Sequence, residues 1–352
     1  MNLDEVESFS SIDSTNILDT LFNFPDQILE AEIVVSESNI PRFYDIDHIL
    51  ILGSGHNALA GLLLQSYLKE KSVIPISVDQ SGKLPKWANK HTLVFSVSYT
   101  GEDLETISSF KEAIQKHCKI IGVCSNGHLK EFCIHRKLPY INLSEDHYSR
   151  NEIGLLFFSM LFSLLNTGLY QLSLSSEIKE CIHTLNEMKK NSSPSMPIAH
   201  NPAKQLAIQI NTSTPLIFGW DVFSFIAQHW AMLFNQNTKR LSHYYLVPDC
   251  TYYSLVGWAH HIKSQEHTSI IFRDHQLESK EMKKRLHFLE RFYNDVTDQQ
   301  ISVNPNGKNI LSKMFSLLYL GELTSVYTSI LSNVDPGPTP IIHQLDEELS
   351  II

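Results

Sequence analysis

A turn rich in hydroxyl groups follows an apolar segment in the first third of the chain. The sequence Ser96-Val-Ser98-Tyr-Thr100-Gly-Glu-Asp-Leu-Glu-Thr106 passes from an expected strand into an expected helix over residues 104–116. Hydroxyl groups and the free amides of a helix start can hold a phosphate monoester, because the amides point at the anion and the helix dipole attracts negative charge. Ser98 and Thr100 are therefore predicted to line a phosphate site.

A glycine turn precedes this loop along the chain. Gly53-Ser-Gly55-His-Asn57-Ala58 follows the first apolar run and fits the G-x-G-x-x-A pattern of dinucleotide-binding turns. Asp79, at the end of the next apolar run, is placed to bind a ribose. The same glycines are also typical of a tight strand-to-helix turn that needs positive φ angles. The turn alone leaves both a nicotinamide cofactor and a purely structural role open.

The elements that must position these turns follow from the hydrophobic pattern. From Asp47 onwards, short apolar runs alternate with longer amphipathic segments, which is typical of β-α-β units and a parallel sheet. The alternation resumes after a polar stretch, so we expect two such sheets and a long helix near 308–332. The expected strands are 48–53, 73–79, 92–98, 119–125 and 139–143 in the first half, and 214–220, 243–249, 268–274 and 301–304 in the second.

Three segments are expected along the chain. Residues 1–45 are acidic with a helical pattern and form an N-terminal lead-in, residues 46–185 form a first domain, and residues 186–352 form a second. The most apolar run, Ile153–Leu165, is too short to span a bilayer, which needs about 20 residues. We expect it to be a helix buried in a core or a subunit interface.

Composition excludes several classes of protein. The 352 residues are 43% hydrophobic, with 14 Gly and 14 Pro, which is typical of a globular chain rather than a fibrous or disordered one. Nine acidic residues and no Lys or Arg precede Arg42, so the remaining residues carry only about −1 of the net charge of −10. Without a basic excess we expect no nucleic-acid partner.

Cysteines and histidines point to a plain intracellular protein. The five cysteines show no CxxC spacing, and the N-terminus lacks the basic start and apolar stretch of a signal peptide, so we expect a cytoplasmic chain with reduced thiols and no membrane segment. The 17 histidines include no HExxH motif, and we expect no metal site.

The strand that leads into Ser-x-Ser-x-Thr-Gly resembles the phosphosugar loop of SIS (sugar isomerase) domains, in particular that of the bifunctional phosphoglucose/phosphomannose isomerases. Further landmarks of that family follow in its order along the chain. They are Asn201-Pro-Ala-Lys204, Gln228-His-Trp230, Asn235-Gln-Asn-Thr-Lys239, Pro248-Asp249, Leu255-Val-Gly-Trp258, Tyr319-Leu-Gly-Glu-Leu-Thr-Ser-Val-Tyr327 and Asp335-Pro336. The resemblance implies two SIS-type three-layer α/β/α sandwich domains with parallel sheets. It also implies a homodimer with sites between subunits, and aldose–ketose isomerisation of glucose 6-phosphate and mannose 6-phosphate without a cofactor.

The positions that carry catalysis in that family are substituted here. In the family a carboxylate moves a proton between C1 and C2, a histidine opens the sugar ring, and a lysine near the C-terminus lies close to the substrate. By resemblance the carboxylate falls at Ser254, the histidine at Ser279 with His275 as the alternative, and the lysine at Asp346. A substitute base is sought among Glu152, His229, His243 and His275.

The phosphate loop is altered as well. The family's Gly-Asn-Thr is Gly101-Glu-Asp103 in this chain, so a carboxylate stands where a hydroxyl binds phosphate. A single negative charge about 4 Å from a phosphate oxygen costs about 4 kcal/mol at an effective dielectric near 20. Alternatively, Asp103 caps its own helix and satisfies the amides that a phosphate would take. Gly55, Asn57 and Arg150 are expected to complete the substrate site.

Two functions are compatible with these residues. The first is a phosphosugar isomerase with weakened or altered catalysis. The second is a non-catalytic protein that binds a sugar or sugar phosphate and regulates a partner. A nicotinamide-dependent oxidoreductase comes third, because only the glycine turn supports it.

Overall fold

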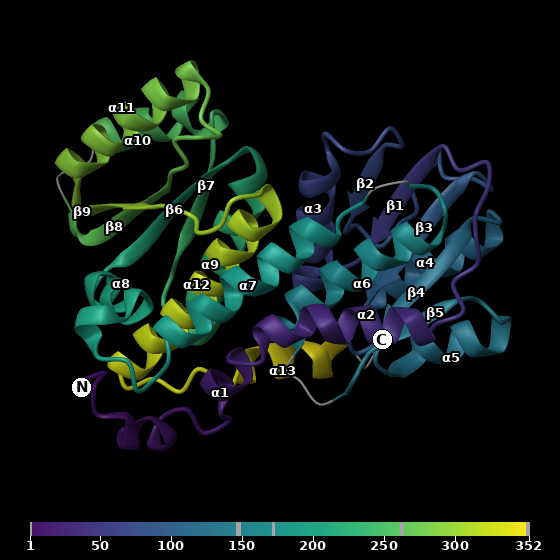
Figure 1. Cartoon of the computed structure of the whole chain (residues 1–352), viewed down its shortest axis with the longest axis horizontal. Helices are drawn as coiled ribbons and strands as arrows, with labels where there is room; N and C mark the ends of the chain where they lie inside the picture. Colours follow the sequence, from purple (N-terminus) through teal and green to yellow (C-terminus); the bar gives the residue numbers. More distant parts are fainter. Residues whose placement is uncertain (1, 146–148, 171–172, 261–263, 350–352) are drawn as a thin grey trace. The chain divides into compact units, whose positions relative to one another are not determined.

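The computed structural model describes residues 2–145, 149–170, 173–260 and 264–349 of the chain (Figure 1). The chain divides into two compact units. The first comprises residues 23–182 and 309–311, and the second comprises residues 1–22, 183–308 and 312–352. Each unit contains one sheet of parallel strands with helices packed on it, so the expected α/β class is confirmed.

The sheet of the first unit has five parallel strands in the order β2-β1-β3-β4-β5. In this order β1 lies between β2, which follows it through α3, and β3, which follows β2 with no helix between them. All five strands lie within two or three residues of the runs expected from the sequence. They are β1 (His48–Leu52), β2 (Ile76–Asp79), β3 (Thr92–Val97), β4 (Lys119–Cys124) and β5 (Tyr140–Asn142).

Helices cover both faces of this sheet. Alternate residues of a strand point to opposite faces, so Ile51 and Leu52 of β1 contact different layers. Ile51 lies against Gly61 of α3 (Gly55–Leu68), where a Cβ would approach the isoleucine Cγ2 to 2.7 Å. Leu52 belongs to the core that α4 (Leu104–Gln115) and α5 (Gly127–Arg136) close from the other side. The helix expected over 104–116 is thus confirmed.

The apolar run of the first unit forms α6 (Ile153–Asn166), and eleven of its 14 residues are buried. It packs against α3 and against α2 (Gln27–Glu37). Gln27 links α2 to the start of α6. Its Nε2 donates to the Asn151 carbonyl at 2.8 Å, and its Oε1 accepts from the Leu155 amide at 3.1 Å. The expectation of a buried helix is confirmed.

The sheet of the second unit has four parallel strands in the order β7-β6-β8-β9. Helix α9 (Ser224–Asn237) approaches the face that contains Gly219, and α11 (Lys280–Val296) packs Tyr293 on Phe218 of the opposite face, with ring centroids 4.6 Å apart. The strands are β6 (Thr214–Trp220), β7 (His243–Val247), β8 (Ser264–Phe272) and β9 (Thr297–Val303). The further helices of the chain are α1 (Ile17–Leu21), α7 (Ser175–Asn191), α8 (Pro202–Ile210), α10 (Ser254–Ala259), α12 (Ile310–Leu331) and α13 (Pro340–Leu349).

The segment expected to form a lead-in over 1–45 divides between the two units. Residues 1–22 belong to the second unit, where the buried Lys204 holds them in place. The Lys204 Nζ donates to Asp4 Oδ1 at 3.3 Å and lies over the rings of Phe9 and Tyr327 at 6.0 and 5.9 Å. The expected boundary between residues 185 and 186 and the division between the units after residue 182 both lie inside α7.

One helix, α12, is long and apolar enough to cross a membrane, when only the described residues are considered. Of its apolar window, 94% is buried within the protein. A helix that is hydrophobic all round is typical of a protein core as well as of a membrane span. The helix gives only weak support for a membrane segment.

Candidate functional site

The hydroxyl-rich loop leaves the carboxyl end of β3, where ligands of open α/β sheets bind. Ser98 is fully buried, and its Oγ accepts hydrogen bonds from the amides of Gly101 at 3.1 Å and Asp103 at 3.4 Å. Thr100 is exposed, and its Oγ1 accepts from the Glu102 amide at 3.4 Å. The loop therefore folds around the Ser98 hydroxyl and presents Thr100 to solvent.

Asn57 of α3 ties the loop to the glycine turn. Its Oδ1 accepts from the Tyr99 amide at 3.0 Å, and its Nδ2 donates to Asp103 Oδ2 at 2.9 Å. Asp103 occupies the N-cap position of α4, but its side chain makes no capping hydrogen bond. The interpretation that Asp103 caps its own helix is wrong, because its carboxylate is oriented towards α3. Asn57, Ser98 and Asp103, which are distant in sequence, are thus brought together.

A second turn, after β4, packs against the loop. Gly101 has a φ of +76°, and a Cβ at this position would lie 1.9 Å from the Asn126 carbonyl oxygen. The Ser125 Oγ donates to the Tyr99 carbonyl at 2.7 Å, and the Leu129 amide donates to the Gly101 carbonyl at 3.0 Å. Only glycine combines this left-handed backbone with so close an approach. The loop is held in one shape by its neighbour.

The second carboxylate of the loop points to a different partner. Glu102 is exposed and pairs with His128 at the start of α5, with 2.5 Å between Oε2 and Nδ1. The hydrogen bond and the charge of Glu102 raise the pKa of His128. Glu102 is thus paired with His128, whereas Asp103 is bound to the Asn57 amide group.

The glycine turn itself begins α3. Gly55 is the first residue of the helix and has a φ of +51°, with no atom within 4 Å of a Cβ placed there. Asp79 binds its own turn, since its Oδ1 accepts from the amide and the hydroxyl of Ser81 at 2.9 and 2.8 Å. These bonds favour the structural interpretation of the turn over ribose binding. Arg150 lies 7% exposed in a short 3-10 helix (Ser149–Asn151), and Glu152, directly before α6, is fully buried.

In the second unit, the hydroxyls of the two serines singled out from the sequence make local bonds. Ser254 begins α10, and its buried Oγ donates to the Cys250 carbonyl at 2.7 Å. Ser279 is the N-cap of α11, and its Oγ accepts from the Met282 amide at 3.1 Å. Only the Ser279 hydroxyl acts as a helix cap, because capping requires an oxygen that accepts from an amide of the first turn. Asp346 lies in α13, and its side chain falls outside the described residues.

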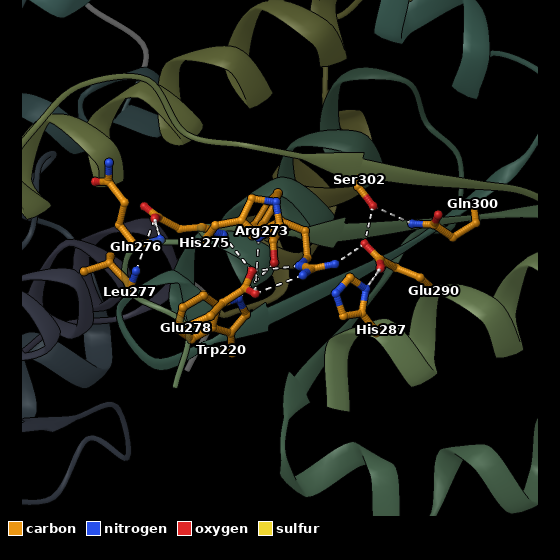
Figure 2. A network of polar contacts seen from close by, with 12 residues as sticks. Trp220, Arg273, His275, Gln276, Leu277, Glu278, His287, Glu290, Gln300 and Ser302 are labelled. Carbon is orange, nitrogen blue, oxygen red and sulfur yellow. Dashed lines mark hydrogen bonds and ion pairs between the residues drawn. The ribbon is translucent and has the colours of Figure 1, made fainter. Parts of the chain in front are cut away.

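The carboxyl ends of β8 and β9 carry a network of charged side chains that sequence reasoning missed (Figure 2). Arg273 binds Glu278 through Nε at 2.7 Å and Nη2 at 2.9 Å, and its Nη1 binds Glu290. Glu290 also accepts from the Ser302 hydroxyl at 2.7 Å and pairs with His287 at 3.0 Å. Burial disfavours the charged form of Glu278, but the Arg273 guanidinium outweighs burial and lowers the pKa of this carboxyl.

A small cavity of about 220 Å³ lies beside this network. Lys313 of α12 reaches into it and pairs with Asp274 at 2.7 Å, and its Nζ also donates to Gln276 at 2.9 Å. His275, the alternative to Ser279, is 63% exposed at the rim and lies 3.7 Å from Glu278. Each cation of the cavity is paired with a carboxylate, so the site has no excess positive charge.

The comparisons with known proteins bear on the whole chain. The SIS domain model matches residues 42–131, and the model of the bacterial phospho-glucose isomerase C-terminal SIS domain matches residues 199–349. A bifunctional phosphoglucose/phosphomannose isomerase from Caldicellulosiruptor bescii is 28% identical over 342 residues, which cover 96% of this chain and 99% of the relative. One from Aquifex aeolicus is 24% identical and covers 86% of this chain and 90% of the relative. A glucose-6-phosphate isomerase like protein from Thermus thermophilus has the same fold, with a TM-score of 0.64, 20% identity and coverage of 97% of this chain and 99% of that one.

The chain belongs to the SIS-domain phosphosugar isomerase family. The resemblance noted in the sequence is confirmed, and so is the expectation of two SIS-type domains with parallel sheets. Within this SIS family member, the assignment of Ser254, Ser279 and Asp346 to catalytic positions stays a prediction.

The other side chains considered as a base are placed as follows. His229 of α9 is fully buried and pairs with the fully buried Glu322 of α12, with 2.8 Å between Nε2 and Oε1. His243 is exposed and is the first residue of β7, so it lies at the amino end of this strand and not at its carboxyl end. Because active sites of open α/β folds form at carboxyl edges, His275 is the one of these histidines best placed to meet a ligand. Among the described residues, no group of three or more His, Cys, Asp or Glu side chains is arranged to hold a metal.

Proposed function

We propose that this protein binds a sugar phosphate at the loop 98–103 and is an aldose–ketose isomerase of weakened or altered activity, acting on glucose 6-phosphate and mannose 6-phosphate. The observation that carries the proposal is the loop itself. Asn57 and Ser98 hold it in a fixed shape at the carboxyl end of β3, next to the start of a 12-residue helix. Backbone amides at such a helix start are suited to an anion.

The weakness of catalysis follows from the second unit. Isomerisation between C1 and C2 needs a base, and a positioned base is worth about 10²–10⁴-fold in rate. The Ser254 hydroxyl donates its proton to a backbone carbonyl, and a hydroxyl is not a useful base near neutral pH. Ser279 is committed to capping α11 and cannot open a sugar ring as a histidine would. His275, exposed beside Glu278, is the side chain that we propose as the remaining proton carrier.

A second candidate function is a non-catalytic sugar-phosphate sensor. Ser279 caps the start of α11, and the Ser254 hydroxyl is bonded to the Cys250 carbonyl, so both hydroxyls have a structural use that does not require chemistry. In that case the ligand bound at the loop changes the affinity for a partner protein instead of being converted.

We also propose that the protein is a cytoplasmic homodimer. The resemblance to isomerases with sites between subunits supports the dimer. Reduced thiols support the cytoplasmic location, since all five cysteines are free and buried. Burial raises the pKa of Cys124 and Cys133 to about 12, so both thiols remain protonated and unreactive. Light scattering of the purified protein measures the mass, and a monomer at micromolar concentration would rule out the dimer.

Titration calorimetry with fructose 6-phosphate, paired with a coupled isomerase assay, tests the function. We expect binding that Ser98→Ala weakens, together with turnover far below the ordinary enzymatic range of about 1–10³ per second. Thr100→Ala, which removes an exposed hydroxyl from the same loop, is the matched variant. Binding without any turnover favours the sensor, and absence of binding by the wild-type protein rejects both functions.

A further inference from the structure

Two side chains at the edge of the loop 98–103 form a contact that the proposed function does not use. Glu102 belongs to the loop, and His128 is the second residue of α5. The Glu102 carboxylate binds His128 twice, because its Oε1 accepts from the His128 amide at 3.1 Å and its Oε2 lies 2.5 Å from the imidazole Nδ1. Both residues belong to the first unit, and both side chains are more than half exposed.

The backbone around this contact admits the carboxylate. Gly127, which begins α5, has a φ of +74°, and a Cβ there would lie 2.5 Å from Glu102 Oε1. A larger residue at this position would therefore push the carboxylate away. The start of α5 also favours an acid, because the helix dipole is positive at that end. The position of Glu102 is thus supported by the backbone of α5 as well as by the imidazole of His128.

Glu102 also lies within the segment that we propose to hold the phosphate. Its amide donates to Thr100 Oγ1 at 3.4 Å, and the amide of Gly101 donates to Ser98 Oγ at 3.1 Å. If the carboxylate left His128, it could turn towards a phosphate bound at these groups. Two negative charges a few ångströms apart repel one another, so sugar-phosphate binding depends on where the Glu102 side chain is held.

The charge of a histidine side chain changes in the physiological pH range. The hydrogen bond and the charge of Glu102 raise the pKa of His128, so the protonated imidazole holds this carboxylate more strongly than the neutral imidazole does. Two further charged groups act on the same imidazole, each less than Glu102: Glu131 of α5 raises the pKa of His128, and Lys111 of α4 lowers it. As the pH rises through the raised pKa, His128 loses its charge and the contact weakens.

We propose that His128 is a positioning residue of the sugar-phosphate site, which holds the Glu102 carboxylate away from the phosphate when protonated and releases it as the pH rises. The inference rests on the proposed function, because it adds regulation to the same loop. Sugar-phosphate binding would then respond to pH through Glu102 as well as through the ionisation of the ligand. Exposed ion pairs contribute modestly, so we expect an effect of about two- to fivefold on the dissociation constant.

Calorimetry with fructose 6-phosphate at several pH values tests the proposal on the full chain. His128→Gln replaces the imidazole by a neutral donor and so mimics its uncharged form. We expect this variant to bind about two- to fivefold more weakly than the wild-type protein near pH 6, and equally well near pH 9. Comparing the two proteins at each pH removes the ionisation of the phosphate itself, which has a pKa of about 6. His135→Gln, in the last turn of the same helix, is the matched control and is expected to leave binding unchanged.

A double-mutant cycle with Glu102→Gln separates positioning from a direct attraction between His128 and the phosphate. If His128 acts by holding the carboxylate, the loss that His128→Gln causes near pH 6 disappears in the Glu102→Gln protein. A loss that persists there would overturn the proposal, because His128 would then attract the ligand directly.

The same titrations distinguish this proposal from the proposed function. Equal binding by His128→Gln and the wild-type protein at every pH would overturn the role of His128 and leave sugar-phosphate binding at the loop intact. Absence of binding by the wild-type protein at every pH would reject the proposed function, and the role of His128 with it.

Discussion

The carboxyl edges of the two sheets use polar residues in opposite ways. At the edge of the first sheet, the loop 98–103 is built from hydroxyls, amides and glycine, and its shape is fixed by Asn57. At the edge of the second sheet, Arg273 and Lys313 are each neutralised by carboxylates. The first arrangement pairs the amides of Gly101, Glu102 and Asp103 with the loop's own hydroxyls beside the start of α4, whereas the second pairs charge with charge. A polar sheet edge is therefore no sign of a ligand site until its partners are counted.

The largest effect expected from this comparison concerns catalysis. If the second edge is structural, the wild-type protein converts glucose 6-phosphate to fructose 6-phosphate about 10²–10⁴-fold more slowly than an intact isomerase. Ser254→Glu alone is expected to recover little, because residues that act as a unit do not contribute additively. A coupled assay on both proteins measures this. Turnover of the wild-type protein in the ordinary enzymatic range would show that the second edge is catalytic after all.

The next effect tests whether the charge network is structural. Arg273→Met leaves the fully buried Glu278 and the half-buried Glu290 without their guanidinium partner, which we expect to lower the free energy of unfolding by about 3–5 kcal/mol. Chemical denaturation at neutral pH measures the loss. Arg273→Lys keeps one charge and is expected to lose less, because lysine cannot bind two carboxylates in a fork.

The same network predicts a pH dependence. The pKa of Glu278 is lowered in the folded protein, so the folded state binds fewer protons than the unfolded state near its ordinary value of 4.5. The stability that Glu278 contributes is present above that pH and is lost as the pH falls through the folded-state pKa. The free energy of unfolding of the wild-type protein should therefore fall as the pH drops below 4.5, and this fall should be shallower in Arg273→Met. If the free energy of unfolding depends on pH equally steeply in the variant and the wild-type protein, other carboxyl groups dominate acid unfolding.

Most of the fold followed from the hydrophobic pattern, whereas the site followed only in part. Buried parallel strands such as β3 are continuous apolar runs, and such runs are visible in a sequence. The partners of Asp103 were not visible, because Asn57 is 46 residues away and the choice between capping and cross-linking depends on packing. The pairing of Arg273 with Glu290 depends in the same way on how β8 and α11 pack.

Helix α7 shows a different reason for a missed element. Its residues have low mean hydropathy, so the sequence indicates only a polar stretch where the structure has a 17-residue helix. Amphipathic helices with one narrow apolar side carry a weak signal in composition. The boundary expected after residue 185 and the division between the units after residue 182 both lie inside this helix.

Substitutions at two glycines of the first unit, Gly101 and Gly55, test what fixes the shape of the loop 98–103. Gly101→Ala places a Cβ on the Asn126 carbonyl in a left-handed backbone, and we expect a loss of about 3 kcal/mol in stability together with loss of sugar-phosphate binding. Gly55→Ala has the same sign of φ but open space around the Cβ, so a loss of about 1–2 kcal/mol is expected. Thermal denaturation and calorimetry compare the two. Equal losses would mean that backbone strain, and not the contact with the second turn, sets the shape of the loop.

The smallest effect concerns the carboxylate that sits within the anion-binding edge. Asp103 Oδ2 accepts from Asn57 Nδ2, so the charge is held beside the start of α4 instead of turning to solvent. Repulsion between this charge and a bound phosphate opposes binding, and Asp103→Thr removes the charge while keeping an oxygen that can accept from Asn57. We expect the variant to bind fructose 6-phosphate several-fold more tightly by calorimetry. Asp103→Asn, which is neutral and nearly isosteric, separates charge from shape: it should tighten binding to a similar extent if repulsion is the cause. Weaker binding by both variants would show instead that the bond between Asp103 and Asn57 keeps the loop open to its ligand. The carboxyl edge of the first sheet would then depend on a charged side chain, as the edge of the second sheet does.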